Sequence, residues 1–226
     1  YRRTRTVESL GMVYQCHYPN KALQTARGAK LSPLHARLVE HGAYLRDVSG
    51  WESADWYAGP AAAPDGGPLT WGRPSWWAQW AAEHRACREA VVLMDMSFMS
   101  KFRVQGRDAG EVLDRMSGNS VNGASGQITY TQWLNERGTL EADLTVTKLA
   151  DDSFLVVATD TAHRHVESQL SRACGLGGHA FVTDVTGAYA QLNVQGPRSR
   201  ELLQSLTTAD LSNDALPFRA AREIDL

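Results

Sequence analysis

Cysteine is scarce in this sequence. Only Cys16, Cys87 and Cys174 occur among the 226 residues, and they lie far apart. Three widely spaced cysteines form neither a disulfide framework nor a cluster of metal ligands, so we predict no bound metal. Free thiols favour a reducing compartment, either a bacterial cytoplasm or the mitochondrial matrix.

Long apolar runs and an excess of charge are also missing. No stretch reaches the ~18 apolar residues of a membrane-spanning helix, and the N-terminal region lacks the apolar segment of a secretory signal. The formal net charge is −2 and the pI is about 6.4, so the chain has no broad positive field. We therefore predict no membrane span and no nucleic acid as a partner. The oligomeric state is not predicted.

The common nucleotide and hydrolase motifs are absent from the sequence. It contains no Gly-x-Gly-x-x-Gly run, P-loop, His-Glu-x-x-His or Gly-x-Ser-x-Gly. The glycine-rich stretch GLGG at 175–178 follows a helical pattern instead of a strand, and we interpret it as a flexible turn from helix to strand. Dinucleotide, nucleoside triphosphate, zinc protease and serine hydrolase functions therefore have no motif support.

The composition, with 43% hydrophobic and 21% charged residues, is that of an ordinary globular protein. The segment AGPAAAPDGGPL concentrates glycine, proline and alanine without periodicity, which is typical of an exposed connection. We place a linker at 59–72, between a first part at 1–58 and a second part at 73–226. The first part is expected to be irregular, apart from a helix over 32–45.

The second part alternates helical and strand patterns. Helices are predicted over 73–89, 108–116, 161–173 and 197–206, and strands over 91–97, 101–105, 127–135, 140–149, 154–159, 179–185 and 188–196. The three strands between 127 and 159 follow one another through short turns, which favours antiparallel pairing. We predict an α+β fold, with a mostly antiparallel sheet and flanking helices.

The strand predicted over 140–149 has an acidic residue near its start. Alternation puts Glu141 and Asp143 on one face and Ala142 on the other, which is compatible with a plain row of solvated side chains. The preceding strand, however, supplies Tyr130 and Trp133, and an aromatic ring beside a carboxylate is how a pocket holds a flat heterocycle. Both interpretations remain open on the pattern alone.

Two other groups are interpreted as structural. Trp76, Trp77 and Trp80 follow helical spacing, which is typical of a helix that packs an aromatic face against a core. His163 and His165 lie two residues apart on a predicted helix and point to different faces. They are expected to be solvated and unable to chelate one ion.

Longer motifs resemble a known family. GRPSWW, LMDMSFMSKFRVQGRDA, ITYTQWLNERGTLEADLTVTKL, FLVVAT and LNVQGPRSRELL occur in this order. Together they resemble the folate-binding module of the aminomethyltransferases, or glycine cleavage T-proteins. The resemblance is strongest to the version fused behind an FAD-dependent amine oxidoreductase in dimethylglycine and sarcosine dehydrogenases. ESLGMVYQCHYPNKAL, at 8–23, is similar to the end of that flavin region, and 32–58 is similar to its connector.

The resemblance implies a division of labour along the chain. Residues 1–58 are then the C-terminal tail and connector of an FAD oxidoreductase domain, and 73–226 are the N-terminal part of the folate-binding domain. Asp143 falls where the family places a catalytic carboxylate beside tetrahydrofolate, with Tyr130 next to the folate and Glu141 as the fallback acid. FAD would be bound outside this chain, which is expected to be an inactive piece of a longer protein.

Two departures from the family pattern affect the site. T-proteins carry two adjacent acids where this chain has Ala142 and Asp143, and the first acid is usually the catalytic one. The register of Asp143 therefore remains open. Where many members have Asn-Asp-Val, this chain has Asn-Ser-Val at 119–121, which removes a second polar candidate.

The predicted function is part of an FAD-dependent N-methyl amine dehydrogenase of the sarcosine or dimethylglycine type. Its folate module passes the released one-carbon unit to tetrahydrofolate, so the substrates are an N-methylated amine and a folate. One alternative is a non-catalytic protein resembling the pyruvate dehydrogenase phosphatase regulatory subunit. Another is a stand-alone aminomethyltransferase, which the dehydrogenase-like connector at 32–58 disfavours.

Overall fold

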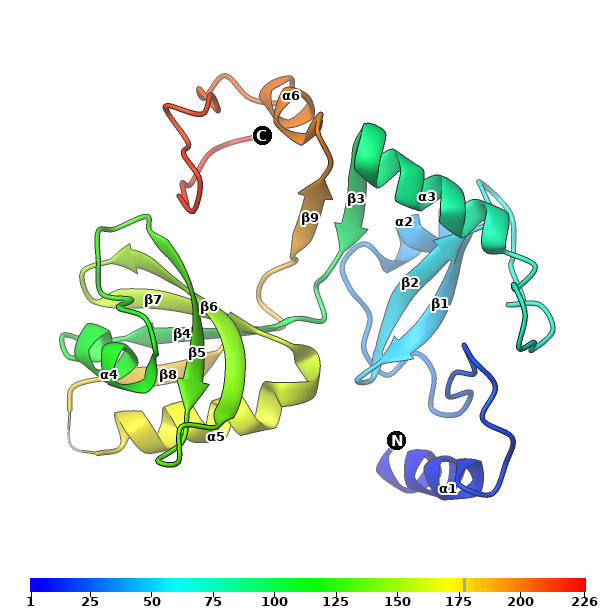
Figure 1. Cartoon of the computed structure of the whole chain (residues 1–226), viewed down its shortest axis with the longest axis horizontal. Helices are drawn as coiled ribbons and strands as arrows, with labels where there is room; N and C mark the ends of the chain where they lie inside the picture. Colours follow the sequence, from blue (N-terminus) through cyan, green and yellow to red (C-terminus); the bar gives the residue numbers. More distant parts are fainter. Residues whose placement is uncertain (177) are drawn as a thin grey trace. The chain divides into compact units, whose positions relative to one another are not determined.

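The computed structural model describes residues 1–176 and 178–226, so residue 177 of the predicted turn at 175–178 lies outside the described part (Figure 1). The chain divides into two compact units. Unit 1 comprises 1–98 and 190–199, and unit 2 comprises 99–189 and 200–226. The domain boundaries placed around the linker at 59–72 stay predictions.

Unit 1 is built from two separate strand pairs and three helices. Its elements are α1 (Arg2–Met12), α2 (His35–Glu40), β1 (Ala43–Val48), β2 (Trp51–Tyr57), α3 (Trp77–Glu89), β3 (Val92–Asp95) and β9 (Leu192–Gln195). Strands β1 and β2 form an antiparallel hairpin, and β3 pairs with β9 in the same sense. Trp56 of β2 stacks on Trp76, with ring centroids 5.8 Å apart and planes 12° apart. Trp76 is buried, whereas Trp77 is 37% exposed, so only part of the predicted aromatic face is core.

The first part of the chain is more regular than expected. The helix expected over 32–45 ends at Glu40, and the strand β1 begins at Ala43. Gly42 separates them with φ +75°, and a Cβ built there would lie 2.0 Å from the Gly59 carbonyl oxygen. Residues that suit the end of a helix by spacing alone therefore become a strand, because pairing with β2 outweighs their local preference.

Unit 2 contains the larger sheet. Its elements are β4 (Ser100–Gln105), α4 (Ala109–Met116), β5 (Ile128–Leu134), β6 (Leu140–Ala150), β7 (Ser153–Ala158), the 3₁₀ turn η1 (Asp160–Ala162), α5 (His163–Cys174) and β8 (Phe181–Asp184). Helix α6 (Ser199–Gln204) also belongs to unit 2, except for its first residue, Ser199, which is assigned to unit 1. The strand order is β5-β6-β7-β4-β8, and every neighbouring pair is antiparallel. The predicted α+β fold with a mostly antiparallel sheet is confirmed.

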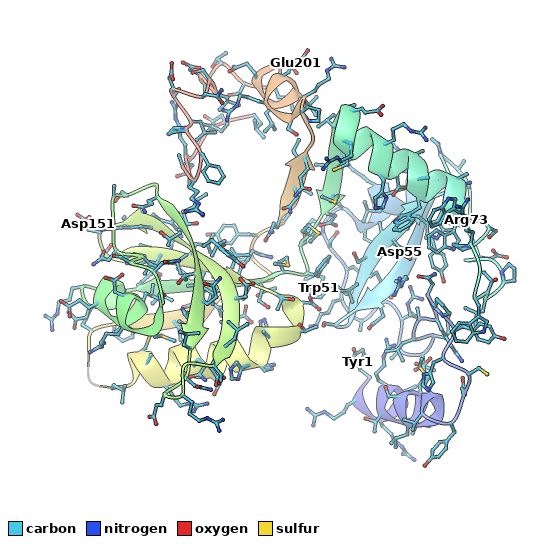
Figure 2. All side chains as sticks on the ribbon, in the orientation of Figure 1. Tyr1, Trp51, Asp55, Arg73, Asp151 and Glu201 are labelled. Carbon is cyan, nitrogen blue, oxygen red and sulfur yellow. The ribbon has the colours of Figure 1, made fainter. Side chains whose placement is uncertain are left out.

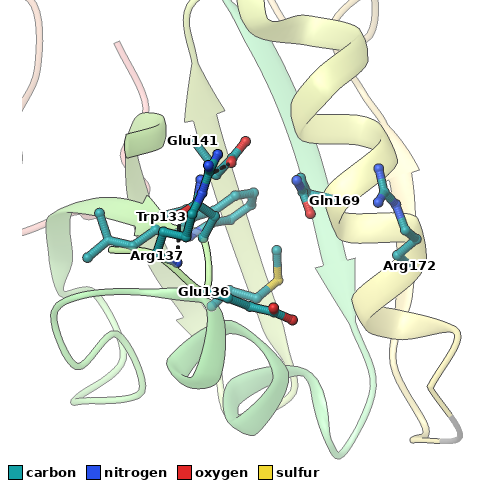
Figure 3. Close-up of a pocket in the computed structure, with 9 residues that line it drawn as sticks. Trp133, Glu136, Arg137, Glu141, Gln169 and Arg172 are labelled. Atoms are coloured by element: carbon teal, nitrogen blue, oxygen red, sulfur yellow. Dashed lines mark hydrogen bonds between the residues drawn. The ribbon is translucent and has the colours of Figure 1, made fainter. Parts of the chain in front are cut away.

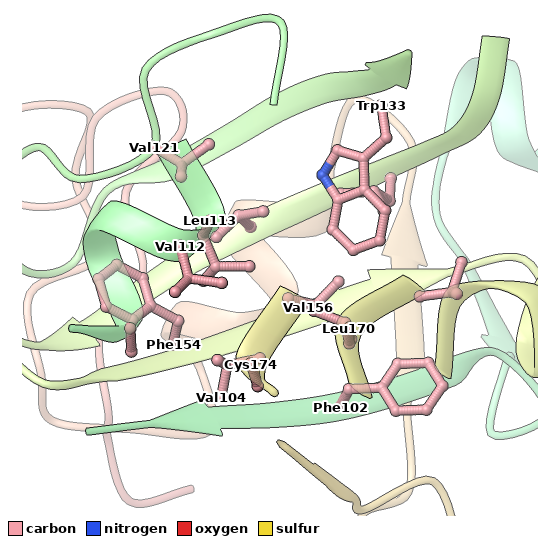
Figure 4. Close-up of a cluster of buried hydrophobic side chains, with 14 of the residues drawn as sticks. Phe102, Val104, Val112, Leu113, Val121, Trp133, Phe154, Val156, Leu170 and Cys174 are labelled. Atoms are coloured by element: carbon pink, nitrogen blue, oxygen red, sulfur yellow. The ribbon is translucent and has the colours of Figure 1, made fainter. Parts of the chain in front are cut away.

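The core of unit 2 lies between one face of this sheet and helices α4 and α5 (Figure 4). Phe102 and Phe154 of the central strands are fully buried, as are Leu113 of α4 and Leu170 of α5. Both helices are amphipathic, so each turns one apolar stripe to the sheet. The β5–β6 hairpin contributes alternate residues to this core, which leaves the residues between them on the opposite face.

Candidate functional site

Tyr130 and Asp143 form the candidate site on the face of the β5–β6 hairpin opposite the core. Gln132 pairs directly with Asp143, and Tyr130 pairs with Thr145, so Tyr130 and Asp143 are diagonal neighbours. The Tyr130 hydroxyl donates a hydrogen bond of 2.7 Å to Asp143 Oδ2. This hydrogen bond raises the pKa of Tyr130, because it favours the protonated phenol. Both side chains are exposed.

Trp133, the other aromatic residue considered as a neighbour of Asp143, faces the core instead. It is 2% exposed, and its indole N–H donates a hydrogen bond of 3.1 Å to Ser117 Oγ. Its partner across the hairpin is Ala142, which is also buried. Of the two aromatic candidates, the structure thus places Tyr130 beside Asp143.

Glu141 does not share a face with Asp143, contrary to the alternation predicted for this strand. Trp133 pairs with Ala142 and Leu134 pairs with Leu140, so Glu141 is an extra residue in a β-bulge. Its carboxylate accepts a hydrogen bond of 2.8 Å from Asn135 Nδ2 and lies 2.8 Å from Nε2 of His165 on α5. The bulge resets the alternation and directs Glu141 toward α5.

The Glu141 carboxylate lines a cavity of about 560 Å³ within unit 2 (Figure 3). The other polar lining residues are Asn135, Glu136 and Arg137 from the hairpin turn, and Gln169 and Arg172 from α5. The hydrogen bond from Asn135, followed by the interactions with His165, lowers the pKa of Glu141. Glu141 is therefore held as a carboxylate, in a place separate from Tyr130 and Asp143.

Sequence reasoning missed the helix side of this cavity. Gln169 and Arg172 are ordinary polar positions of an amphipathic helix, and no motif joins them to a hairpin about thirty residues earlier. The close pair of Asn135 and Glu141 was detectable in principle, because a turn residue often bonds back across its own hairpin.

His163 is also more than a solvated side chain. Its Nδ1 lies 3.0 Å from Ser100 Oγ, and its Nε2 lies 3.2 Å from Asp184 Oδ2. The order resembles a serine–histidine–acid triad, but Ser100 is completely buried and donates a hydrogen bond to the Thr159 carbonyl. A nucleophile must reach its substrate, so this cluster joins β4, α5 and β8 and carries no hydrolysis.

Two features that the described residues lack delimit the site further. No group of three histidine, cysteine, aspartate or glutamate residues among them is arranged to hold a metal ion. No helix in residues 1–176 and 178–226 is long and apolar enough to cross a membrane. The chemistry available at the hairpin is that of carboxylates, a phenol, amides and guanidinium groups.

Comparison with known proteins agrees with this architecture. Residues 34–226 match the family described as the GCVT N-terminal domain. The chain belongs to this family. The resemblance to aminomethyltransferases found in the sequence is thereby confirmed, and this GCVT N-terminal domain extends through both units.

Three curated relatives match the chain over all or nearly all of its length. A 4-methylaminobutanoate oxidase (formaldehyde-forming) of Paenarthrobacter nicotinovorans is 39% identical over 100% of the chain. The mitochondrial pyruvate dehydrogenase phosphatase regulatory subunit of Mus musculus is 29% identical over 100% of it, and the mitochondrial sarcosine dehydrogenase of Mus musculus is 29% identical over 96%. The chain spans only 27%, 26% and 28% of these relatives, respectively.

A solved structure shows the same fold. The glycine cleavage system aminomethyltransferase T of Bartonella henselae superposes with a TM-score of 0.68, over 85% of this chain and 47% of its own. The two sequences are 24% identical, so this likeness establishes the fold alone. The polypeptide thus shares its fold with this aminomethyltransferase.

Proposed function

We propose that the chain is the connector and folate module of an FAD-dependent N-methyl amine dehydrogenase. The module would transfer the one-carbon unit released from the amine to tetrahydrofolate. The observation that carries the proposal is the match over the whole chain to an oxidase of a methylamino acid, together with membership of the GCVT N-terminal domain family. FAD is assigned no residue of this chain.

The Tyr130–Asp143 pair fits a reduced pteridine. A flat heterocycle with N–H groups needs an aromatic surface and a hydrogen-bond acceptor at its edge, and the pair supplies both. Tetrahydrofolate, when bound, supplies the nucleophilic nitrogen that takes up the one-carbon unit. Asp143 would accept the proton that this nitrogen releases, while the Tyr130 hydroxyl holds the carboxylate in one orientation.

Burial supports Asp143 over position 142 as the place of the catalytic acid. Ala142 is 5% exposed and packs in the core of unit 2, where an ionised carboxylate would be costly. Asp143 lies on the open face, where a ligand has access. We propose that a further part of the full-length protein covers this face and makes it a low-dielectric site, in which a proton acceptor is more effective.

Substituting Asp143→Asn in the full-length protein tests this role. The amide keeps the shape of the side chain but accepts no proton at neutral pH. Formation of methylenetetrahydrofolate should fall by about 100-fold, because general bases contribute ~10²–10⁴-fold to rates, whereas amine oxidation should change little. Asp152→Asn, in the exposed turn between β6 and β7, is the control. Unchanged folate product in Asp143→Asn would show that the proton goes elsewhere.

The second candidate is a non-catalytic regulatory protein. It is supported by the 29% identity over the whole chain to the pyruvate dehydrogenase phosphatase regulatory subunit. Calorimetric titration of the full-length protein with a reduced folate separates the two. Saturable heat supports the folate module, and no heat at high micromolar ligand supports the regulatory protein. A stand-alone aminomethyltransferase has the support of the shared fold only.

The compartment stays a proposal as well. Relatives include a protein of the bacterium Paenarthrobacter nicotinovorans and mitochondrial proteins of Mus musculus. A bacterial cytoplasm and the mitochondrial matrix both suit three free cysteines.

A further inference from the structure

A cavity of about 510 Å³ lies wholly within unit 1, at the residues of β2, α3 and β3. Its walls include the aromatic side chains of Tyr57, Trp80 and Phe98 and the thioethers of Met94 and Met96. Aromatic and methionine side chains together form an adaptable, polarisable surface that suits apolar groups. The volume is within the range of small-molecule sites.

Acidic side chains dominate the charge at this cavity, whose lining also includes His84. Three carboxylates line it, those of Asp55, Glu83 and Asp95, and within the described part of the chain no lysine or arginine does. Asp55, which is labelled on β2 in Figure 2, is paired with Arg46 of β1 at 3.1 Å. Glu83 and Asp95 are the two acids whose hydrogen bonds come from uncharged donors.

The partners of these two acids are backbone and hydroxyl groups. The N–H of Tyr57 donates a hydrogen bond of 3.1 Å to Glu83 Oε1. The Ser32 hydroxyl donates to Asp95 Oδ2, and the N–H of Ser97 donates to Asp95 Oδ1 at 3.0 Å. Such donors orient a carboxylate but do not neutralise it.

The ionisation of the neighbouring groups reflects their burial. Burial raises the pKa of Glu83, in spite of the hydrogen bond from Tyr57 and the electrostatic effect of His84, which both lower it. Burial and then the negative charges of Glu83 and Asp95 raise the pKa of Tyr57. A cation in the cavity would favour the ionised form of Glu83 and relieve the repulsion between the acids.

The walls decide what kind of cation fits. Hard inorganic cations prefer oxygen ligands and gain little from aromatic and thioether surfaces. No group of three histidine, cysteine, aspartate or glutamate residues in the described part of the chain is arranged to hold a metal ion, and anions are repelled by the carboxylates. A methylated ammonium group combines apolar methyl groups with a positive charge. Its methyl groups can pack against aromatic rings while its charge faces a carboxylate. We propose that this cavity binds an organic ammonium ion, with Glu83 as counter-ion and Trp80 as an aromatic wall. The site is separate from the folate pair and does not depend on it.

Choline and its uncharged isostere 3,3-dimethyl-1-butanol test the proposal on the full-length protein. They have the same shape and differ in charge, so calorimetry at constant ionic strength isolates the charge. Choline should bind saturably and at least tenfold more tightly than the alcohol. Equal binding of the two, or no binding of choline, would overturn the proposal; the second result would mean that another part of the full-length protein fills the cavity.

Three variants and one control locate the binding. Glu83→Gln removes the counter-ion, and Trp80→Leu removes the aromatic wall; each should weaken choline binding by about tenfold or more. Trp80→Phe keeps a weaker aromatic wall, so its affinity for choline should lie between those of wild type and Trp80→Leu. This variant keeps the test valid if Trp80→Leu does not fold. Glu89→Gln, on the same helix but outside the cavity, should bind choline like wild type. Wild-type affinity in Glu83→Gln would contradict the assignment.

Discussion

At the scale of single residues, Glu52 shows how one side chain ties an irregular segment to a hairpin. Glu52 of β2 is 6% exposed and accepts a hydrogen bond of 2.6 Å from the N–H of Gly28. It also forms a salt bridge with Arg27, which in turn donates a hydrogen bond of 2.7 Å to the Leu45 carbonyl. The hydrogen bond from Arg27 is the main reason that the pKa of Glu52 is lowered.

The lowered pKa of Glu52 predicts how its contribution changes with pH. A carboxyl whose pKa is depressed by folding stabilises the folded state above its ordinary value of 4.5, and this stability is lost as the pH falls through the lower, folded pKa. At neutral pH, Glu52→Gln should therefore reduce the free energy of local opening by about 1–3 kcal/mol. Below the folded pKa the two proteins should converge.

Hydrogen exchange followed by mass spectrometry measures the free energy of local opening in the full-length protein. Peptides covering 27–30 and 45–52 should exchange faster in Glu52→Gln at neutral pH. Glu40→Gln, an exposed acid at the end of α2, is the matched control and should leave them unchanged. Equal protection in Glu52→Gln and wild type at neutral pH would mean that the ion pair adds no stability.

At the scale of elements, the turn from β4 to α4 is shaped by one glycine. Gly106 has φ +129°, and a Cβ built there would lie 2.1 Å from the carbonyl oxygen of His179, just before β8. Asp108 at the start of α4 accepts a hydrogen bond of 2.6 Å from the N–H of the same histidine. The turn and the start of β8 are thus in direct backbone contact.

Alanine at Gly106 should be more harmful than alanine at a glycine with space around it. Gly138, in the β5–β6 turn, has φ +74° and no atom within 4 Å of a built Cβ, so Gly138→Ala carries backbone strain alone, about 1–2 kcal/mol. Gly106→Ala adds a clash with the backbone and should lower the free energy of unfolding at least twice as much as Gly138→Ala does. Hydrogen exchange of peptides covering 100–116 and 179–185 gives the comparison, and equal costs would show that the turn relaxes without loss.

At the scale of the whole molecule, the chain order and the compact units do not coincide. Strand β9 follows β8 by only a few residues, yet it pairs with β3 and belongs to unit 1, whereas β8 pairs with β4 in unit 2. Residues 190–199 should therefore open together with a segment about one hundred residues earlier in the chain.

Destabilising one unit at a time checks this coupling. Trp56→Phe weakens a stacked ring pair in unit 1 and should accelerate hydrogen exchange in β9 more than in β8. Phe154→Leu weakens the core of unit 2 and should have the opposite effect. The same response of β8 and β9 to both substitutions would mean that the two units open as one.

Much of the secondary structure of unit 2 was predictable, because patterns of neighbouring residues specify its strands and helices. Strand patterns and short turns predicted β5, β6 and β7, and the alternation in 140–149 placed Leu144 and Val146, which are buried, on the same face. The spacing of apolar residues likewise predicted α4 and α5. The family followed from long ordered motifs, which the match over 34–226 confirms.

The sequence by itself thus determined the strands, the helices, the α+β class and the family. Tertiary structure decided which side chains are in contact. A single extra residue in β6 sends Glu141 to His165 and leaves Asp143 with Tyr130. Likewise, Glu52 meets Arg27 only because packing brings the two together. Helix and strand periods are set by neighbouring residues, but a bulge or a distant ion pair depends on packing across the fold, which no local pattern records.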